Sequence, residues 1–123
     1  MTAEASLANV TVYGIANCDT VKKARGWLDE RGVAHEFVDF RRHPVPAPRV
    51  ADWVERLGSK ALRNTSGRSY RALPVEKSDW TEEQWATQFS EDPMLIKRPV
   101  IEVDGEPVIA GFRDPSALEK RLE

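Results

Sequence analysis

The 123-residue sequence contains one cysteine, and its position suggests nucleophilic chemistry. Cys18 follows a short β-branched run, residues 10–13, and precedes Asp19 and Thr20, which are typical of a helix start. The first backbone N–H groups of a helix lack internal partners, and the helix dipole places partial positive charge there. Both effects favour the thiolate, which is the nucleophilic form of cysteine. The sequence therefore predicts that Cys18 is a nucleophile.

A different interpretation of Cys18 is a small buried apolar residue, the commoner role of an isolated cysteine. The polar neighbours Asn17 and Asp19 oppose this interpretation, because they exclude a continuous apolar run. Asp19 also brings a negative charge that disfavours the thiolate, and Lys22 and Lys23 can offset it from the next turn. A single cysteine excludes an internal disulfide.

The composition is that of an ordinary globular protein, with 41% hydrophobic and 31% charged residues, and the length predicts one domain. The net charge of −2 supplies no general attraction to nucleic acids or anionic membranes, so we expect neither as a partner. No apolar run is long enough to span a membrane, and residues 1–9 lack the features of a secretory signal. We expect a cytoplasmic monomer with a flexible tail at 1–9 and a single domain at 10–123.

The residues around Cys18 predict a strand, a helix and a second strand. The helix carries Val21, Ala24, Trp27 and Leu28 on one face, and Gly32 is suited to its end. The second strand is expected at 33–40. This order requires a right-handed crossover and parallel pairing of the two strands.

Residues 41–48 contain three prolines and form a connector into a helical insertion expected at about 46–95. Val50, Trp53, Val54 and Leu57 have helical spacing, and Gly58 is expected to end that helix. Residues 63–71 are expected to form a loop. A capping box at 81–84 starts a second main helix. We interpret the acidic residues of this region as a solvated face; they are Glu82, Glu83, Glu91 and Asp92. We interpret its aromatic residues as packing residues; they are Trp53, Trp80, Trp85 and Phe89.

The last third predicts a β-hairpin and a helix. Strands at 100–103 and 107–110 are joined by Asp104 and Gly105, a strong hairpin signal, and a helix follows after Pro115. The complete order, βαβ, helices and ββα, predicts an α/β thioredoxin-like fold with a four-stranded mixed sheet. In that plan the third strand begins at a cis proline that faces the cysteine. Pro99 is the candidate, and it would place Arg98 beside Cys18.

Four motifs, in this order, resemble the ArsC/Spx/YffB family. They are YGIANCDT at 13–20, ALRNT at 61–65, IKRP at 96–99 and GFR at 111–113, and the resemblance covers residues 10–122. The likeness is greatest to the YffB-like branch. It implies that Cys18 is the nucleophile, and that Arg63, Arg98 and Arg113 bind an oxyanion or a glutathione carboxylate. Planar guanidinium groups suit both ligands, because they donate paired hydrogen bonds.

Two departures from the family pattern separate its possible functions. Residues 14–16 are GIA where the family's arsenate reductases have His-Asn-Pro, and Val21 stands where many Spx proteins have a second cysteine. We therefore expect a monothiol oxidoreductase that uses glutathione as co-substrate, with glutathione or a glutaredoxin as the resolving thiol. The alternatives are a glutaredoxin-coupled arsenate reductase and an Spx-like regulator that binds RNA polymerase.

No bound cofactor is expected. His35 and His43 are the two histidines, and we interpret both as surface residues rather than metal ligands.

Overall fold

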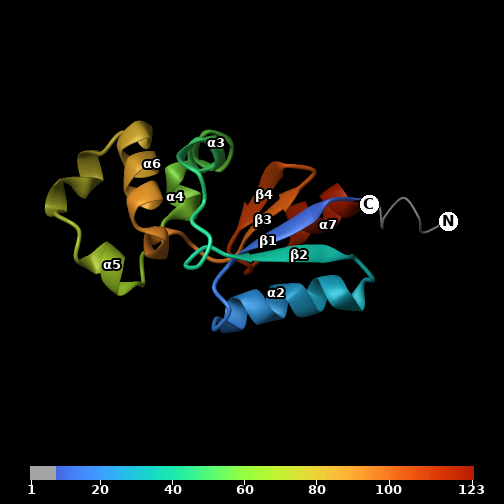
Figure 1. Ribbon diagram of the computed structural model, residues 1–123. Helices are drawn as coiled ribbons and strands as arrows, with labels where there is room; N and C mark the ends of the chain where they lie inside the picture. Colours follow the sequence, from blue (N-terminus) through green and yellow to red (C-terminus); the bar gives the residue numbers. More distant parts are fainter. Residues whose placement is uncertain (1–7) are drawn as a thin grey trace. The chain divides into compact units, whose positions relative to one another are not determined.

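The structure, a computed structural model, describes residues 8–123 (Figure 1). The expected tail at 1–9 therefore lies outside the described residues except for Ala8 and Asn9. Asn9 is held in place, because its N–H donates to Asp104 Oδ1 at 3.0 Å and its carbonyl accepts from Asp104 N at 2.8 Å. The chain divides into two compact units. The sheet unit contains the chain up to His43 together with Arg98–Glu123, and the helical unit is Pro44–Lys97.

The sheet unit contains the four predicted strands and two helices. The elements are β1 (Val10–Gly14), α2 (Asp19–Glu30), β2 (His35–Asp39), β3 (Val100–Val103), β4 (Glu106–Ala110) and α7 (Ser116–Leu122). The strand order is β2-β1-β3-β4. β1 is parallel to β2 and antiparallel to β3, and β3 is antiparallel to β4. The predicted four-stranded mixed sheet is confirmed.

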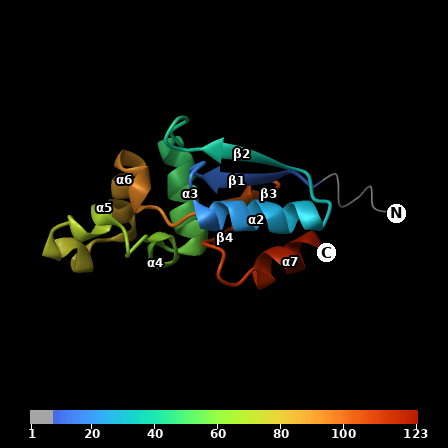
Figure 2. The ribbon, with the colours of Figure 1, turned by 90° about the horizontal axis from the view of Figure 1, so that it is seen from below.

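The core of the sheet unit lies between one face of the sheet and the helices α2 and α7, which lie next to each other in Figure 2. The predicted apolar face of α2 supplies three of its members, and β1 and β3 supply alternate residues, as the strand period requires. The buried cluster comprises Val10, Val12, Val21, Ala24, Leu28, Val33, Ile101, Val103, Phe112 and Leu118. This packing fixes the start of α2 relative to the ends of the strands.

The predicted hairpin between β3 and β4 is confirmed. Asp104 and Gly105 both have positive φ, 54° and 81°, which is the backbone geometry of the type I′ turn that favours Asp-Gly.

The helical unit contains α3 (Ala47–Leu57), α4 (Ser59–Leu62), α5 (Arg68–Arg71), η1 (Val75–Asp79), α6 (Glu82–Glu91) and η2 (Pro93–Leu95). α3 and α6 pack against each other, and Trp53 and Trp85 are 0% and 1% exposed. The predicted capping box begins α6, because Thr81 N donates to Gln84 Oε1 at 2.7 Å and Gln84 N donates to Thr81 Oγ1 at 3.1 Å. No helix within residues 8–123 is long and apolar enough to cross a membrane.

The expected loop at 63–71 is wrong in its second half, because α5 forms there. Gly67 is the N-cap of α5, and its carbonyl accepts from Arg71 N at 3.2 Å. Arg71 Nη1 donates to the Ser66 carbonyl at 2.7 Å, which joins the last residue of α5 to the residue before its N-cap. Glycine is tolerated both at helix N-caps and in loops, so Gly67 did not distinguish a helix from a loop at this position.

Gly14 allows β1 and α2 to approach closely, which gives a first testable prediction. A Cβ at Gly14 would lie 2.6 Å from Val21 Cγ2, and Val21 is 1% exposed within the core. We expect Gly14→Ala to lower the free energy of unfolding by about 1–3 kcal/mol, as for other overpacked cores. Urea unfolding followed by circular dichroism measures the change.

Gly26 provides the matched control within α2. A Cβ there would meet no heavy atom within 4 Å, and the residue lies in the helix interior. We expect Gly26→Ala to raise the free energy of unfolding by about 0.5–1 kcal/mol, because alanine loses less backbone freedom than glycine. Equal effects of the two substitutions would contradict the steric argument at Gly14.

Candidate active site

Cys18 is the N-cap residue of α2. Its backbone is extended, with φ −140° and ψ 120°, and its carbonyl accepts from Lys22 N at 3.0 Å. Its side chain makes no capping hydrogen bond, is partly exposed, and packs against the buried cluster of the sheet unit. The thiol therefore lies at the positive end of the α2 dipole.

The loop that precedes Cys18 is held by the end of β2. Asp39 pairs with Gly14 in the parallel ladder, and its Oδ2 accepts from Ala16 N at 3.4 Å. Phe40 N also donates to the Gly14 carbonyl at 2.9 Å. Cys18 is thereby placed beyond the carboxyl ends of two parallel strands, where open α/β sheets commonly bind their ligands.

The Arg98–Pro99 peptide bond is cis, the isomer expected from the sequence. Pro99 is buried directly before β3, and its carbonyl accepts from Gly111 N at 2.7 Å. Arg98 is half-buried. The hydrogen bond joins the residue that follows Arg98 to the segment that leads into Arg113.

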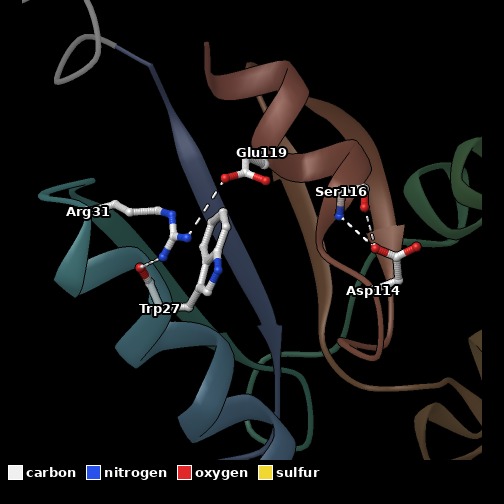
Figure 3. A network of polar contacts seen from close by, with 5 residues as sticks. All are labelled: Trp27, Arg31, Asp114, Ser116 and Glu119. Carbon is white, nitrogen blue, oxygen red and sulfur yellow. Dashed lines mark hydrogen bonds and ion pairs between the residues drawn. The ribbon is translucent and has the colours of Figure 1, made fainter.

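Arg113 is exposed and lies between two fixed neighbours. Phe112 is 6% exposed and meets Trp27 of α2 edge-to-face, with ring centroids 5.7 Å apart. Asp114 accepts hydrogen bonds from the Ser116 hydroxyl and from Ser116 N (Figure 3). These bonds lower the pKa of the Asp114 carboxyl, and the bond from the hydroxyl has the larger effect. The backbone of Arg113 is therefore anchored on both sides.

The same view shows how α2 and α7 are connected next to this loop. The Arg31 guanidinium lies 3.8 Å from the Trp27 ring centroid, and its Nη2 lies 3.9 Å from Glu119 Oε2 of α7 (Figure 3). Both charged side chains are exposed, so the ion pair itself contributes little to stability. Its role is to cover the Trp27 ring that packs on Phe112.

Arg63 belongs to the helical unit, where both its side chain and its backbone make contacts. Its Nη2 donates to Ser59 Oγ at 2.8 Å, and its guanidinium carbon lies 4.2 Å from the Trp85 ring centroid. Its backbone forms an antiparallel bridge with Ile96. Beside this bridge, Lys97 N donates to the Leu62 carbonyl at 2.7 Å.

Of the predicted site residues, Cys18, Arg98, Pro99 and Arg113 thus belong to the sheet unit and Arg63 to the helical unit. The interpretation of His35 as a surface residue is wrong. Its side chain is 5% exposed, and Nε2 accepts from Arg25 Nε at 3.3 Å. No group of three or more potential metal-binding side chains occurs in the described part of the chain.

Glu82 is the residue that sequence analysis missed, because it was interpreted as part of a solvated face. Its Oε2 accepts from Ser59 N at 2.8 Å and its Oε1 accepts from Ser59 Oγ at 2.7 Å. It thereby caps α4 from the first turn of α6. The residues lie 23 positions apart, so no local pattern connects them.

These contacts make the stability of the chain depend on pH. The Ser59 hydroxyl bond, the Ser59 backbone bond and the Arg63 charge lower the pKa of the Glu82 carboxyl below its ordinary 4.5. Glu82 therefore contributes stability that is complete above the unfolded-state value and is lost as the pH falls through the lower folded-state value. We expect Glu82→Gln to lose less unfolding free energy than the parent chain on acidification from pH 6. Urea titrations at stepped pH test this, and parallel curves would contradict it.

Comparisons with known proteins identify the family of this chain and relatives that share its fold. The ArsC family profile matches residues 13–119. An uncharacterised protein of Haemophilus influenzae is 35% identical over 106 residues, which cover 85% of this chain and 92% of its own. A solved structure named YffB (PA3664) is 34% identical with a TM-score of 0.83, covering 94% of this chain and 100% of the other.

Two further groups of relatives bear on function. A structure described as a possible arsenate reductase from Streptococcus mutans is 32% identical with a TM-score of 0.78, covering 87% of this chain and 93% of that one. Relatives named global transcriptional regulator Spx match 85% of this chain at 22–24% identity. The thioredoxin-like α/β fold of these relatives is the fold of this chain, which belongs to the ArsC family.

Proposed function

We propose that this protein is a glutathione-dependent monothiol oxidoreductase. The observation that carries the proposal is a single cysteine, Cys18, at the N-cap of α2 with no capping hydrogen bond from its side chain. At the level of the family, the ArsC fold supports a thiol oxidoreductase. The co-substrate and the order of the steps are part of the proposal.

In the first step the Cys18 thiolate attacks the glutathione sulfur of a mixed disulfide between glutathione and a substrate thiol. A Cys18–glutathione disulfide forms, the original S–S bond breaks, and the departing substrate thiolate carries the electron pair and takes a proton from water. In the second step an external thiolate, from glutathione or a glutaredoxin, attacks the glutathione sulfur and releases the Cys18 thiolate. An external thiol is required because the chain has no second cysteine.

The arginines Arg63, Arg98 and Arg113 are proposed to bind the anionic part of the ligand. A guanidinium group donates paired hydrogen bonds to a carboxylate or an oxyanion, and it does so without changing its own charge. Neither a bound cofactor nor a metal is needed for disulfide exchange.

Intact mass spectrometry after incubation with glutathione disulfide tests the proposal. The expected product carries one glutathionyl group, which excess reduced glutathione removes. An unmodified chain under these conditions would refute the thiol-exchange function.

The Streptococcus mutans structure favours arsenate reduction as the second candidate. Turnover of arsenate in the presence of glutathione and glutaredoxin would establish that reaction instead. The Spx relatives suggest a further experiment, in which the chain is tested for retention of purified RNA polymerase. Retention without glutathionylation would favour a regulator.

A further inference from the structure

Within the helical unit, the Arg63 guanidinium is held by a small hydrogen-bonded network. The Ser59 hydroxyl donates to Glu82 Oε1 at 2.7 Å, so its oxygen is left to accept from Arg63 Nη2 at 2.8 Å. Glu82 in turn fixes the backbone of Ser59 through its second oxygen. Ser59 is 1% exposed, so water has little access to its hydroxyl. The hydroxyl therefore has one favoured orientation, which presents its acceptor side to Arg63.

An aromatic platform fixes the other side of the guanidinium. The Trp85 ring lies below it at 4.2 Å and is 1% exposed. Tyr70 stacks on Trp85 with an interplanar angle of 9°, and Trp80 meets Trp85 edge-on with centroids 4.9 Å apart. Because the neighbouring rings hold Trp85 in place, the cation–π contact restrains the Arg63 guanidinium.

The network uses only part of the donor capacity of Arg63. Arginine has five N–H donors, and within residues 8–123 the side-chain hydrogen bond of Arg63 uses Nη2. Arg63 Nε is buried without an acceptor in that same part of the chain, and Trp85 Nε1 is as well. A guanidinium that is fixed in place but incompletely paired is suited to receive an acceptor group from a ligand.

We propose that Ser59, held by Glu82, is a positioning residue that orients Arg63 for an anionic ligand. This inference rests on the proposed function in taking Arg63 as an anion-binding residue, and it adds the two residues that hold it there. A long arginine side chain normally loses rotamer freedom when it binds a ligand. Fixing the guanidinium in advance removes part of that cost and raises the affinity for a carboxylate.

The test measures anion binding without thiol chemistry. S-methylglutathione has the carboxylates of glutathione but cannot exchange with Cys18, so the full-length protein can be titrated directly. The side-chain N–H signals of Arg63 and Trp85 are suitable NMR reporters, since both nitrogens are buried and exchange slowly with water. In the parent chain we expect both signals to shift and saturate.

Ser59→Ala changes no charge and removes the acceptor for Arg63. We expect its affinity for S-methylglutathione to fall about tenfold, the effect of losing one hydrogen bond to a charged group. Glu82→Gln leaves an oxygen for one of the two bonds from Ser59, and we expect a smaller fall. Ser78→Ala is the matched control, because its hydroxyl bonds to the Val75 carbonyl, away from Arg63, and we expect unchanged affinity.

Three results would overturn the inference. Ser59→Ala could bind S-methylglutathione as tightly as the parent chain does. Glu82→Gln could bind it more tightly, which would make Glu82 a competitor for the charge of Arg63 rather than a support. The Arg63 signal of the parent chain could also fail to respond, whereas the separate glutathione disulfide reaction at Cys18 still forms its adduct. In that last case the positioning role fails and the thiol chemistry stands.

Discussion

Replacement of Cys18 by serine is expected to abolish both the glutathione adduct and all thiol-dependent turnover. A serine hydroxyl is a weak nucleophile unless an adjacent base activates it, and it cannot form a disulfide. The chain has no second cysteine that could substitute. The measurement is intact mass after glutathione disulfide treatment, together with a coupled turnover assay. An adduct on the variant would show that another side chain reacts and would remove Cys18 from the mechanism.

The same substitution is expected to leave the fold intact or stabilise it. Cys18 is the N-cap of α2 without a capping bond, and serine is among the residues preferred at that position. Cys18→Ser should therefore raise the free energy of unfolding by up to about 1 kcal/mol. Cys18→Ala is the matched control, since it removes the thiol without adding a cap. A loss of activity together with a gain in unfolding free energy in Cys18→Ser would identify the cysteine as functional rather than structural.

The candidate nucleophile could be predicted from the sequence because it breaks a local rule. A position that favours serine, threonine, aspartate or asparagine carries a cysteine instead, directly before Asp19 and Thr20. Natural sequences tend to violate local preferences at functional sites. The violation was visible without any knowledge of tertiary contacts.

The sheet was predictable for the opposite reason, namely that its local signals agree with one another. The β-branched run of β1, the Asp104-Gly105 turn and the apolar face of α2 each favour the element that forms there. The capping box at Thr81 likewise gave the start of α6. Such agreement across levels is what allows a fold to be inferred from sequence.

The network around Arg63 could not be predicted, because it depends on contacts between distant residues. Glu82 and its neighbour Glu83 both follow a helix N-cap and are both exposed, so the sequence does not distinguish them. Only tertiary packing brings its carboxylate to Ser59 and, through Ser59, to Arg63. His35 was misjudged because the sequence does not show that its ring contacts Arg25 of α2 and the nearby Val33 carbonyl, nor that its side chain is only 5% exposed.

Arg98→Ala is expected to have the largest effect among the arginine substitutions. Arg98 is half-buried, and Pro99, which follows it, is held through its carbonyl by Gly111 N. Loss of a hydrogen bond to a charged ligand typically costs about 1.5–3 kcal/mol, which corresponds to a fall of roughly 10- to 150-fold in kcat/KM for a glutathione mixed disulfide. Arg98→Lys should restore less than the full loss, because an ammonium group lacks the paired donors of a guanidinium.

A neutral substrate separates ligand binding from activation of the thiol. 2-Hydroxyethyl disulfide has no carboxylate, so without glutathione present the rate at which it modifies Cys18 should fall in Arg98→Ala only to the extent that the charge of Arg98 activates the thiol. Lys97→Ala removes the same charge from the exposed neighbouring position and is the matched control. We expect Lys97→Ala to lower the rate with either disulfide less than twofold, the range of a screened surface charge of about 0.4 kcal/mol. Equal losses in Lys97→Ala and Arg98→Ala would show that the region acts through its net charge, and Arg98 would then have no specific contact with the ligand.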